Sequence, residues 1–256
     1  MSARETALAR DVLAATARLR DAVAVLRFDA PTAWVYNPLD YAWDLHTQWV
    51  RTWGATRRRV LLMGMNPGPW GMVQTGVPFG EVAAVRDWLG LRGAVGRPDP
   101  EHPRRPVAGL ACTRSEVSGR RLWGHLAARF GSPEAFFADH FVINYCPLVF
   151  MEDTGRNRTP DKLPVAESEP LFAACDAWVR DLVGLYRPEW VVGVGGFARA
   201  KLTGLFGPDV PDVDLSHRPD GIGWVLHPSP ASPAANRGWA AAADKQLAAQ
   251  GIWSAP

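Results

Sequence analysis

The sequence of 256 residues is poor in cysteine, and its three cysteines are scattered. Cys112, Cys146 and Cys175 form no Cys-x-x-Cys pair, whereas structural zinc sites and iron–sulfur clusters usually need four clustered ligands. We therefore expect no metal and no other cofactor. An odd, scattered set of cysteines also argues against a disulfide framework and favours a reducing compartment.

Long apolar runs are absent as well. No stretch approaches the roughly 18 consecutive apolar residues that indicate a membrane-spanning helix. The N-terminus, "MSARETALARDVLAATARLR", carries charged residues throughout and has no apolar centre of the kind found in secretory signals. We therefore expect a protein that is not secreted and has no membrane partner.

Lysine occurs only at Lys162, Lys201 and Lys245. None of the three falls in a loop that is predicted to form a site, which disfavours Schiff-base chemistry. The net charge of +2 is too small to indicate a nucleic-acid partner by itself. Neither GxxxxGK[ST] nor GxSxG occurs, which argues against a P-loop and a nucleophile elbow.

Short apolar runs alternate with helical patterns along the chain. Helices are predicted for 4–26, 40–53, 80–90, 118–131, 171–185 and 197–206. A last helix is expected to begin near Ser232, a suitable N-cap, with Pro233 at its first position. Buried strands are predicted for "VLLM" (60–63), "HFVINYCPLVF" (140–150), "EWVVGVGG" (189–196) and "IGWVLHPSP" (222–230).

This alternation predicts the α/β class: a single three-layer α/β/α domain with a central four-stranded, mainly parallel sheet. The chain shows no internal repeat and no linker rich in Gly or Ser. We therefore expect residues 1–256 to form one domain, with a helix within residues 1–30 packed on it.

Polar residues stand at three of the predicted strand ends: Asn66, Asn144 and His227. Each has an ordinary structural explanation, as a turn residue, a satisfied buried amide and a hydrogen-bonded strand-end histidine. However, ligands of open α/β sheets bind at the carboxyl ends of the strands, where this topology would gather all three. The set contains no carboxylate, which disfavours a paired-carboxylate hydrolase.

The segment "GVGGFA", Gly193–Ala198, leaves a second interpretation open. It fits the GxGxxA pattern of dinucleotide-binding proteins, between a strand and a helix. It belongs to the third strand unit rather than to an opening βαβ unit, and Pro208 and Pro211 interrupt the region where an acidic ribose ligand would be sought. A dinucleotide-binding oxidoreductase is therefore the weaker alternative.

Five blocks carry a resemblance to a known family. They are "GMNPGPWGMVQTGVPFGEV", "CTRSEVSGRRLWG", "NYCPLVFM", "GRNRTPDKLP" and "HPSPASPAANRGW". They resemble the single-strand-selective monofunctional uracil-DNA glycosylases of the uracil-DNA glycosylase superfamily, in family order and over most of residues 34–253. Residues 1–30 are expected to lie outside the resemblance.

The resemblance implies a monofunctional DNA glycosylase of base excision repair, without lyase activity. Such an enzyme flips uracil or a 5-substituted uracil, such as 5-hydroxymethyluracil, out of single- or double-stranded DNA. It then hydrolyses the N-glycosidic bond and leaves an abasic site. A non-catalytic damaged-DNA-binding module of the same fold is the alternative. The expected location is the cytoplasm, in association with the nucleoid, for a bacterial protein and the nucleus for a eukaryotic one, and we expect a monomer.

The resemblance also assigns roles to residues. Asn66 positions the attacking water, and His227 donates a hydrogen bond to uracil O2 as charge develops there. Phe79 stacks on the base and Asn144 reads its edge, while Met65 and Gly68 line the base pocket with backbone groups.

Two loops are predicted to contact DNA. The predicted contacts are Ser115, Ser118, Gly119, Arg120, Ser229, Pro230, Ala231, Ser232, Asn236 and Arg237. Small residues and helix N-termini let backbone N–H groups approach phosphate. Ala231 stands where the family often carries a long basic residue that fills the space of the flipped base. We therefore expect weaker activity on well-paired duplex than on single strands or mismatches.

Overall fold

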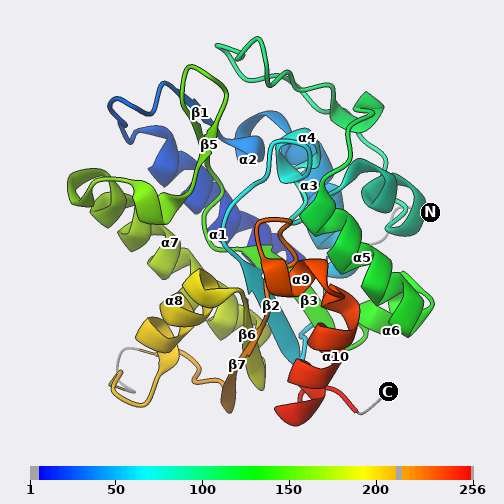
Figure 1. Ribbon diagram of the computed structural model, residues 1–256. Helices are drawn as coiled ribbons and strands as arrows, with labels where there is room; N and C mark the ends of the chain where they lie inside the picture. The colour runs from blue at the N-terminus through cyan, green and yellow to red at the C-terminus, as the bar shows by residue number, and fades with distance from the viewer. Residues whose placement is uncertain (1–5, 212–214, 255–256) are drawn as a thin grey trace.

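The computed structural model describes residues 6–211 and 215–254, and a four-stranded sheet forms its centre (Figure 1). The strand order is β3 (His140–Asn144), β2 (Val60–Gly64), β6 (Trp190–Val194) and β7 (Gly221–Val225), and all three pairings are parallel. Every residue of β2 and β3 is buried, as expected for strands that are covered on both faces.

Helices cover both faces of this sheet. On one face α1 (Ala7–Ala24), α7 (Val165–Tyr186) and α8 (Gly196–Phe206) pack together, and on the other lie α5 (Val117–Phe130) and α10 (Trp239–Ala249). From β2 the chain crosses to β3 at one edge of the sheet and then moves in the opposite direction to β6 and β7. Because the connections between parallel strands are right-handed, this reversal places helices on both faces. The predicted three-layer α/β/α fold is confirmed.

The N-terminal helix α1 packs on the domain as predicted. The Thr6 hydroxyl caps it by accepting a hydrogen bond from the N–H of Ala9 at 3.1 Å. Its buried stripe includes Val12, Leu19 and Val23 and rests largely against α7. The first residues of the predicted helix, 4 and 5, lie outside the described residues.

The predicted strand 140–150 is wrong, because the chain leaves the central sheet after Asn144. It turns, and β4 (Val149–Met151) joins a small antiparallel sheet between β1 (Trp34–Tyr36) and β5 (Asn157–Arg158). Pro147 marks the turn, since a proline has no N–H to continue the ladder.

Smaller differences concern the helices. Within the predicted helix 80–90 the structure has a π-helix, Ala84–Trp88. Ser232 is an N-cap as predicted, but it caps only α9 (Pro233–Asn236), because Gly238, with φ +129°, separates α9 from α10. The remaining elements are α2 (Pro38–Tyr41), α3 (Trp43–Trp53), α4 (Met72–Thr75), α6 (Pro133–Phe137) and the 3₁₀ helices Gly109–Ala111 and Pro160–Lys162.

Within 6–211 and 215–254, no helix is both long and apolar enough to cross a membrane.

Candidate active site

A cavity of about 470 Å³ lies at the carboxyl edge of the central sheet. Asn66 follows β2, Asn144 ends β3 and His227 follows β7, and all three line the cavity together with Phe79. The strand register pairs Gly64 with Asn144, so the first two side chains start from neighbouring strand ends. The structure therefore brings together the residues that the strand-end argument predicted to meet.

The amide of Asn66 is held in one orientation. Its Nδ2 donates a hydrogen bond to the carbonyl oxygen of Leu148 at 3.1 Å, in the turn where the chain leaves β3 for β4. The amide oxygen is thus left as the acceptor for a ligand or a water molecule. The turn that interrupts the predicted strand 140–150 thus supplies the carbonyl group of Leu148, which orients the Asn66 side chain.

The loop that carries Asn66 is fixed by Gln74, which is completely buried. The Nε2 atom of Gln74 donates hydrogen bonds to the carbonyl oxygens of Pro69 at 3.1 Å and Pro106 at 3.0 Å. Its Oε1 accepts from the N–H of Ala108 at 2.9 Å. One side chain thereby joins two loops, and a buried amide with both ends bonded is costly to displace.

Phe79 has a backbone φ of +54°, in the left-handed region that non-glycine residues rarely adopt. Its carbonyl oxygen accepts from the indole N–H of Trp123 at 3.1 Å and from the N–H of Glu81 at 2.7 Å. Such a conformation costs about 1–3 kcal/mol and persists where the surroundings enforce it, often at functional sites. The ring lies against the end of β2, where a Cβ on Gly64 would be 2.5 Å from Phe79 Cε2.

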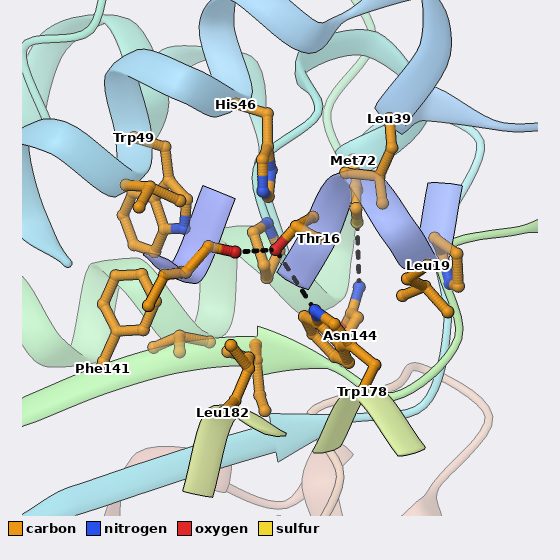
Figure 2. A pocket seen from close by; sticks show the side chains of 16 residues that line it. Thr16, Leu19, Leu39, His46, Trp49, Met72, Phe141, Asn144, Trp178 and Leu182 are labelled. Atoms are coloured by element: carbon orange, nitrogen blue, oxygen red, sulfur yellow. Dashed lines mark hydrogen bonds between the residues drawn. The ribbon is translucent and has the colours of Figure 1, made fainter. Parts of the chain in front are cut away.

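Asn144 lines both the large cavity and a smaller pocket of about 20 Å³, which Figure 2 shows. Its Nδ2 donates to the Sδ atom of Met72 at 3.3 Å, and its Oδ1 is buried without a hydrogen-bond partner among the described residues. A thioether sulfur only accepts hydrogen bonds, so the NH₂ group must face Met72. The unpaired oxygen is therefore the acceptor that a bound molecule would meet.

His227 is held as a neutral donor. The N–H of Ser229 donates to its Nδ1 at 3.1 Å, so the ring proton of the neutral form lies on Nε2. Burial lowers the pKa of His227 to about 4. The Phe79 and His227 ring centroids are 5.9 Å apart. At neutral pH the side chain thus offers an uncharged N–H beside the aromatic ring.

The glycines of "GVGGFA" have a packing explanation. Gly195 has φ +94°, and a Cβ there would lie 3.0 Å from the Cβ of His227. A Cβ on Gly193 would lie 2.3 Å from the backbone nitrogen of Arg199 in α8. These positions let α8 and the His227 loop approach β6 closely, which accounts for the pattern without a dinucleotide.

Apart from Gly119, which is buried outside the cavity lining, the remaining predicted residues divide into two groups. Met65, Gly68, Ser118, Ser229, Ala231 and Ser232 line the cavity. Ser115, Arg120, Pro230, Asn236 and Arg237 are exposed outside its lining.

Two of the predicted DNA contacts have clear structural tasks. Gly119 is buried, and a Cβ there would lie 2.2 Å from the carbonyl oxygen of Phe79, so its small size brings α5 against that residue. The Asn236 side chain accepts from Arg121 at 2.9 Å and donates to the Pro230 carbonyl oxygen at 2.9 Å. Arg121 also donates to the carbonyl oxygen of Pro228 at 3.0 Å, so these contacts shape the loop after His227.

Five further residues line the cavity and were not predicted from the sequence: Pro67, Pro69, Glu116, Asn157 and Thr159. Glu116 adds one carboxyl group to the lining, although the three strand-end residues themselves include none. No local sequence pattern indicates that it would line the cavity.

Among the described residues, no three His, Cys, Asp or Glu side chains are grouped so that they could hold a metal ion.

Comparisons with known proteins identify the family. A family model described as the uracil DNA glycosylase superfamily matches residues 52–249, and this is the class of protein that the fold and the cavity define. The single-strand selective monofunctional uracil-DNA glycosylase of Rattus norvegicus is 45% identical over 245 residues, covering 96% of this chain and 86% of the relative. That of Bos taurus is 46% identical, covering 96% and 88%.

The chain therefore belongs to the family of single-strand-selective monofunctional uracil-DNA glycosylases. The similarity covers 96% of the chain, so it extends into residues 1–30, which were expected to lie outside it. The crystal structure of wild-type Pedobacter heparinus SMUG2 has the same fold, with a TM-score of 0.67 at 16% identity, covering 95% of this chain and 97% of that chain.

Proposed function

We propose that the protein is a monofunctional uracil-DNA glycosylase of base excision repair. It excises uracil and 5-substituted uracils from DNA by hydrolysing the N-glycosidic bond. The observation that carries this proposal is the position of Asn66, Phe79, Asn144 and His227 around one cavity. Family membership adds that relatives over nearly the whole chain bear the name of this activity.

The base is bound by stacking and by its polar edge. A flipped uracil lies on the ring of Phe79, with its N3–H donated to the unpaired Oδ1 of Asn144. The amide has a second N–H besides the one that faces Met72, and this N–H donates to uracil O4. Cytosine has an acceptor at N3 and a donor at C4, so the fixed amide rejects it.

The leaving group is stabilised by His227. As the glycosidic bond lengthens, negative charge grows on the departing base and is greatest near its carbonyl oxygens. The neutral Nε2–H donates to O2, in the way an oxyanion hole stabilises charge that develops in a transition state. The low pKa of His227 keeps this donor uncharged at neutral pH.

The water is oriented by Asn66. The sugar becomes oxocarbenium-like as the base departs, so the attacking water needs little general-base assistance. The Asn66 oxygen accepts a hydrogen bond from that water, while Leu148 holds the amide in place. The water oxygen bonds to C1′, and the released proton passes to solvent, leaving an abasic site and the free base.

The loop after His227 favours single-stranded substrates. Ala231 is exposed at the cavity rim and has no long side chain to occupy the space of a flipped base. Opening a well-paired duplex costs a few kcal/mol of unstacking and unpairing, which this loop compensates poorly. Unpaired DNA avoids that cost.

A single-stranded oligonucleotide with one uracil tests the function. We expect strand cleavage only after alkali treatment, because the abasic product is alkali-labile and the enzyme makes no break itself. A matched oligonucleotide with cytosine at the same position should stay intact. Binding of the uracil strand with no alkali-labile product would instead identify a damaged-DNA-binding module and refute the proposal.

A further inference from the structure

Glu116 is half-buried, its side chain lines the cavity, and the structure makes room for its carboxyl group. A Cβ on Gly68 would lie 1.4 Å from its Oε1, and a Cβ on Gly71 would lie 1.8 Å from its Oε2. No residue larger than glycine fits at either place without moving the carboxyl. Two glycines of the Asn66 loop thus create the space in which this acid sits.

Nothing in the described part of the protein satisfies this carboxyl group. Glu116 occupies the N-cap position of α5, but its side chain makes no capping hydrogen bond. No hydrogen bond or ion pair joins its side chain to another described residue, whereas the amides of Asn66 and Asn144 donate to Leu148 and Met72. This half-buried carboxyl group is therefore available to a ligand or a water molecule in the cavity.

The surroundings keep this acid partly protonated. Burial and the charge of Glu81 raise the pKa of Glu116 to about 7. His227, which lines the same cavity, is uncharged at neutral pH. Arg121 on α5 donates hydrogen bonds to Pro228 and Asn236. Arg120, also on α5, is exposed to solvent. The group is therefore a hydrogen-bond donor below about pH 7 and an acceptor above it.

The proposed orientation of the base leaves one edge for Glu116. Asn144 takes the N3 and O4 edge, and His227 takes O2. The C5 edge lies across the ring from O2, so it is left to the rest of the lining. That lining includes residues 65–69, Glu116, Ser118, Asn157 and Thr159, and Glu116 carries the one carboxyl group among these described residues.

We propose that Glu116 is a specificity-determining residue that hydrogen-bonds polar substituents on C5 of the excised pyrimidine. This inference rests on the proposed function. A hydroxymethyl group both donates and accepts, so it pairs with either form of the acid. A formyl group only accepts, so it pairs with the protonated acid alone.

Single-turnover excision from single strands carrying uracil, 5-hydroxymethyluracil or 5-formyluracil tests this assignment. We expect the Glu116→Ala variant to lose about tenfold in the 5-hydroxymethyluracil-to-uracil rate ratio, the usual scale for a lost hydrogen bond to a charged or acidic group. The Glu169→Gln variant, at an exposed position of α7, serves as the matched control and should keep the wild-type ratio.

The pH profile gives a second, independent readout. In the wild-type protein the 5-formyluracil-to-uracil ratio should fall by about tenfold as pH rises from about 6 to 8, since the donor is lost. In Glu116→Gln the amide donates at every pH, so this fall should disappear. Titration of the formylated base itself affects both proteins equally and cancels in the comparison.

The outcomes are distinct. If wild-type protein excises none of the three bases, the proposed function fails. If it excises uracil but Glu116→Ala keeps both ratios within about twofold, the role of Glu116 is refuted. If Glu116→Ala does not fold, Glu116→Gln decides: a pH profile identical to that of the wild type overturns the proposal.

Discussion

Gly64 is the position where one added methyl group should disturb the base pocket most directly. A Cβ there would lie 2.4 Å from Asn144 Oδ1, 2.5 Å from Phe79 Cε2 and 2.6 Å from Phe79 Cζ. Ordinary contacts between such atoms are about 3.5–4.0 Å. In Gly64→Ala the ring and the amide must therefore move apart by about 1 Å.

The expected magnitude follows from that displacement. Misplacing a group that positions the substrate by about 1 Å costs about a hundredfold in rate. Overpacking a buried site by one methyl group costs about 1–3 kcal/mol of folding free energy. We therefore expect a Gly64→Ala protein that folds but whose kcat/KM on single-stranded uracil DNA is about a hundredfold lower.

The assay is single-turnover uracil excision, together with urea unfolding to measure stability. Gly124→Ala is the matched control, because Gly124 lies in α5 and, apart from its chain neighbours and the local helix backbone, no atom lies within 4 Å of an added Cβ. That variant should keep wild-type activity and gain up to about 1 kcal/mol, as alanine replaces glycine inside a helix. An excision rate for Gly64→Ala within about threefold of the control would refute the close-contact reasoning.

Three further predictions concern His227, Ala231 and the buried histidines. His227→Ala should lower the single-turnover rate by about 10²–10³-fold, the cost of removing one such donor, and DNA binding measured by anisotropy should be largely kept; a near-wild-type rate would contradict the assigned role. Ala231→Arg should raise excision from U·A duplex relative to single strands, and an unchanged ratio would show that the loop does not limit duplex activity. His46, His140 and His227 all have their pKa lowered to about 4 by burial. The unfolded chain therefore binds more protons between about pH 6.5 and pH 4, so stability is complete above about pH 6.5 and falls below it, by up to about 1.4 kcal/mol per pH unit for each histidine. Urea unfolding at several pH values measures the slope, and a flat profile would argue that these rings are not buried neutral.

The central sheet was predictable because its strands are short apolar runs that the helices must cover on both faces. The same rule predicts that Asn66, Asn144 and His227 lie at one edge of the sheet. The division of 140–150 was not predictable from hydrophobicity, since Val149 and Met151 are as completely buried as the strand before them. Both parts are buried, but in different sheets.

The chemistry of individual side chains was harder to predict. The environment of Glu116 depends on Gly68 and Gly71, which are distant in sequence, and its own neighbours suggest only a helix start. The proton position on His227 depends on the direction of one backbone N–H, from Ser229. Such features arise from close packing between segments and leave no local pattern in the sequence.

The hydrogen bond from Ser229 to His227 has a consequence for which bases are excised quickly. An imidazole whose single proton is held on Nε2, and whose pKa is about 4, stabilises charge without surrendering that proton. The excised base then departs as an anion and is protonated afterwards by solvent. Reactivity should therefore follow the acidity of the free base at N1, so that electron-withdrawing groups such as fluorine at C5 accelerate bond cleavage even where they add no contact with the protein.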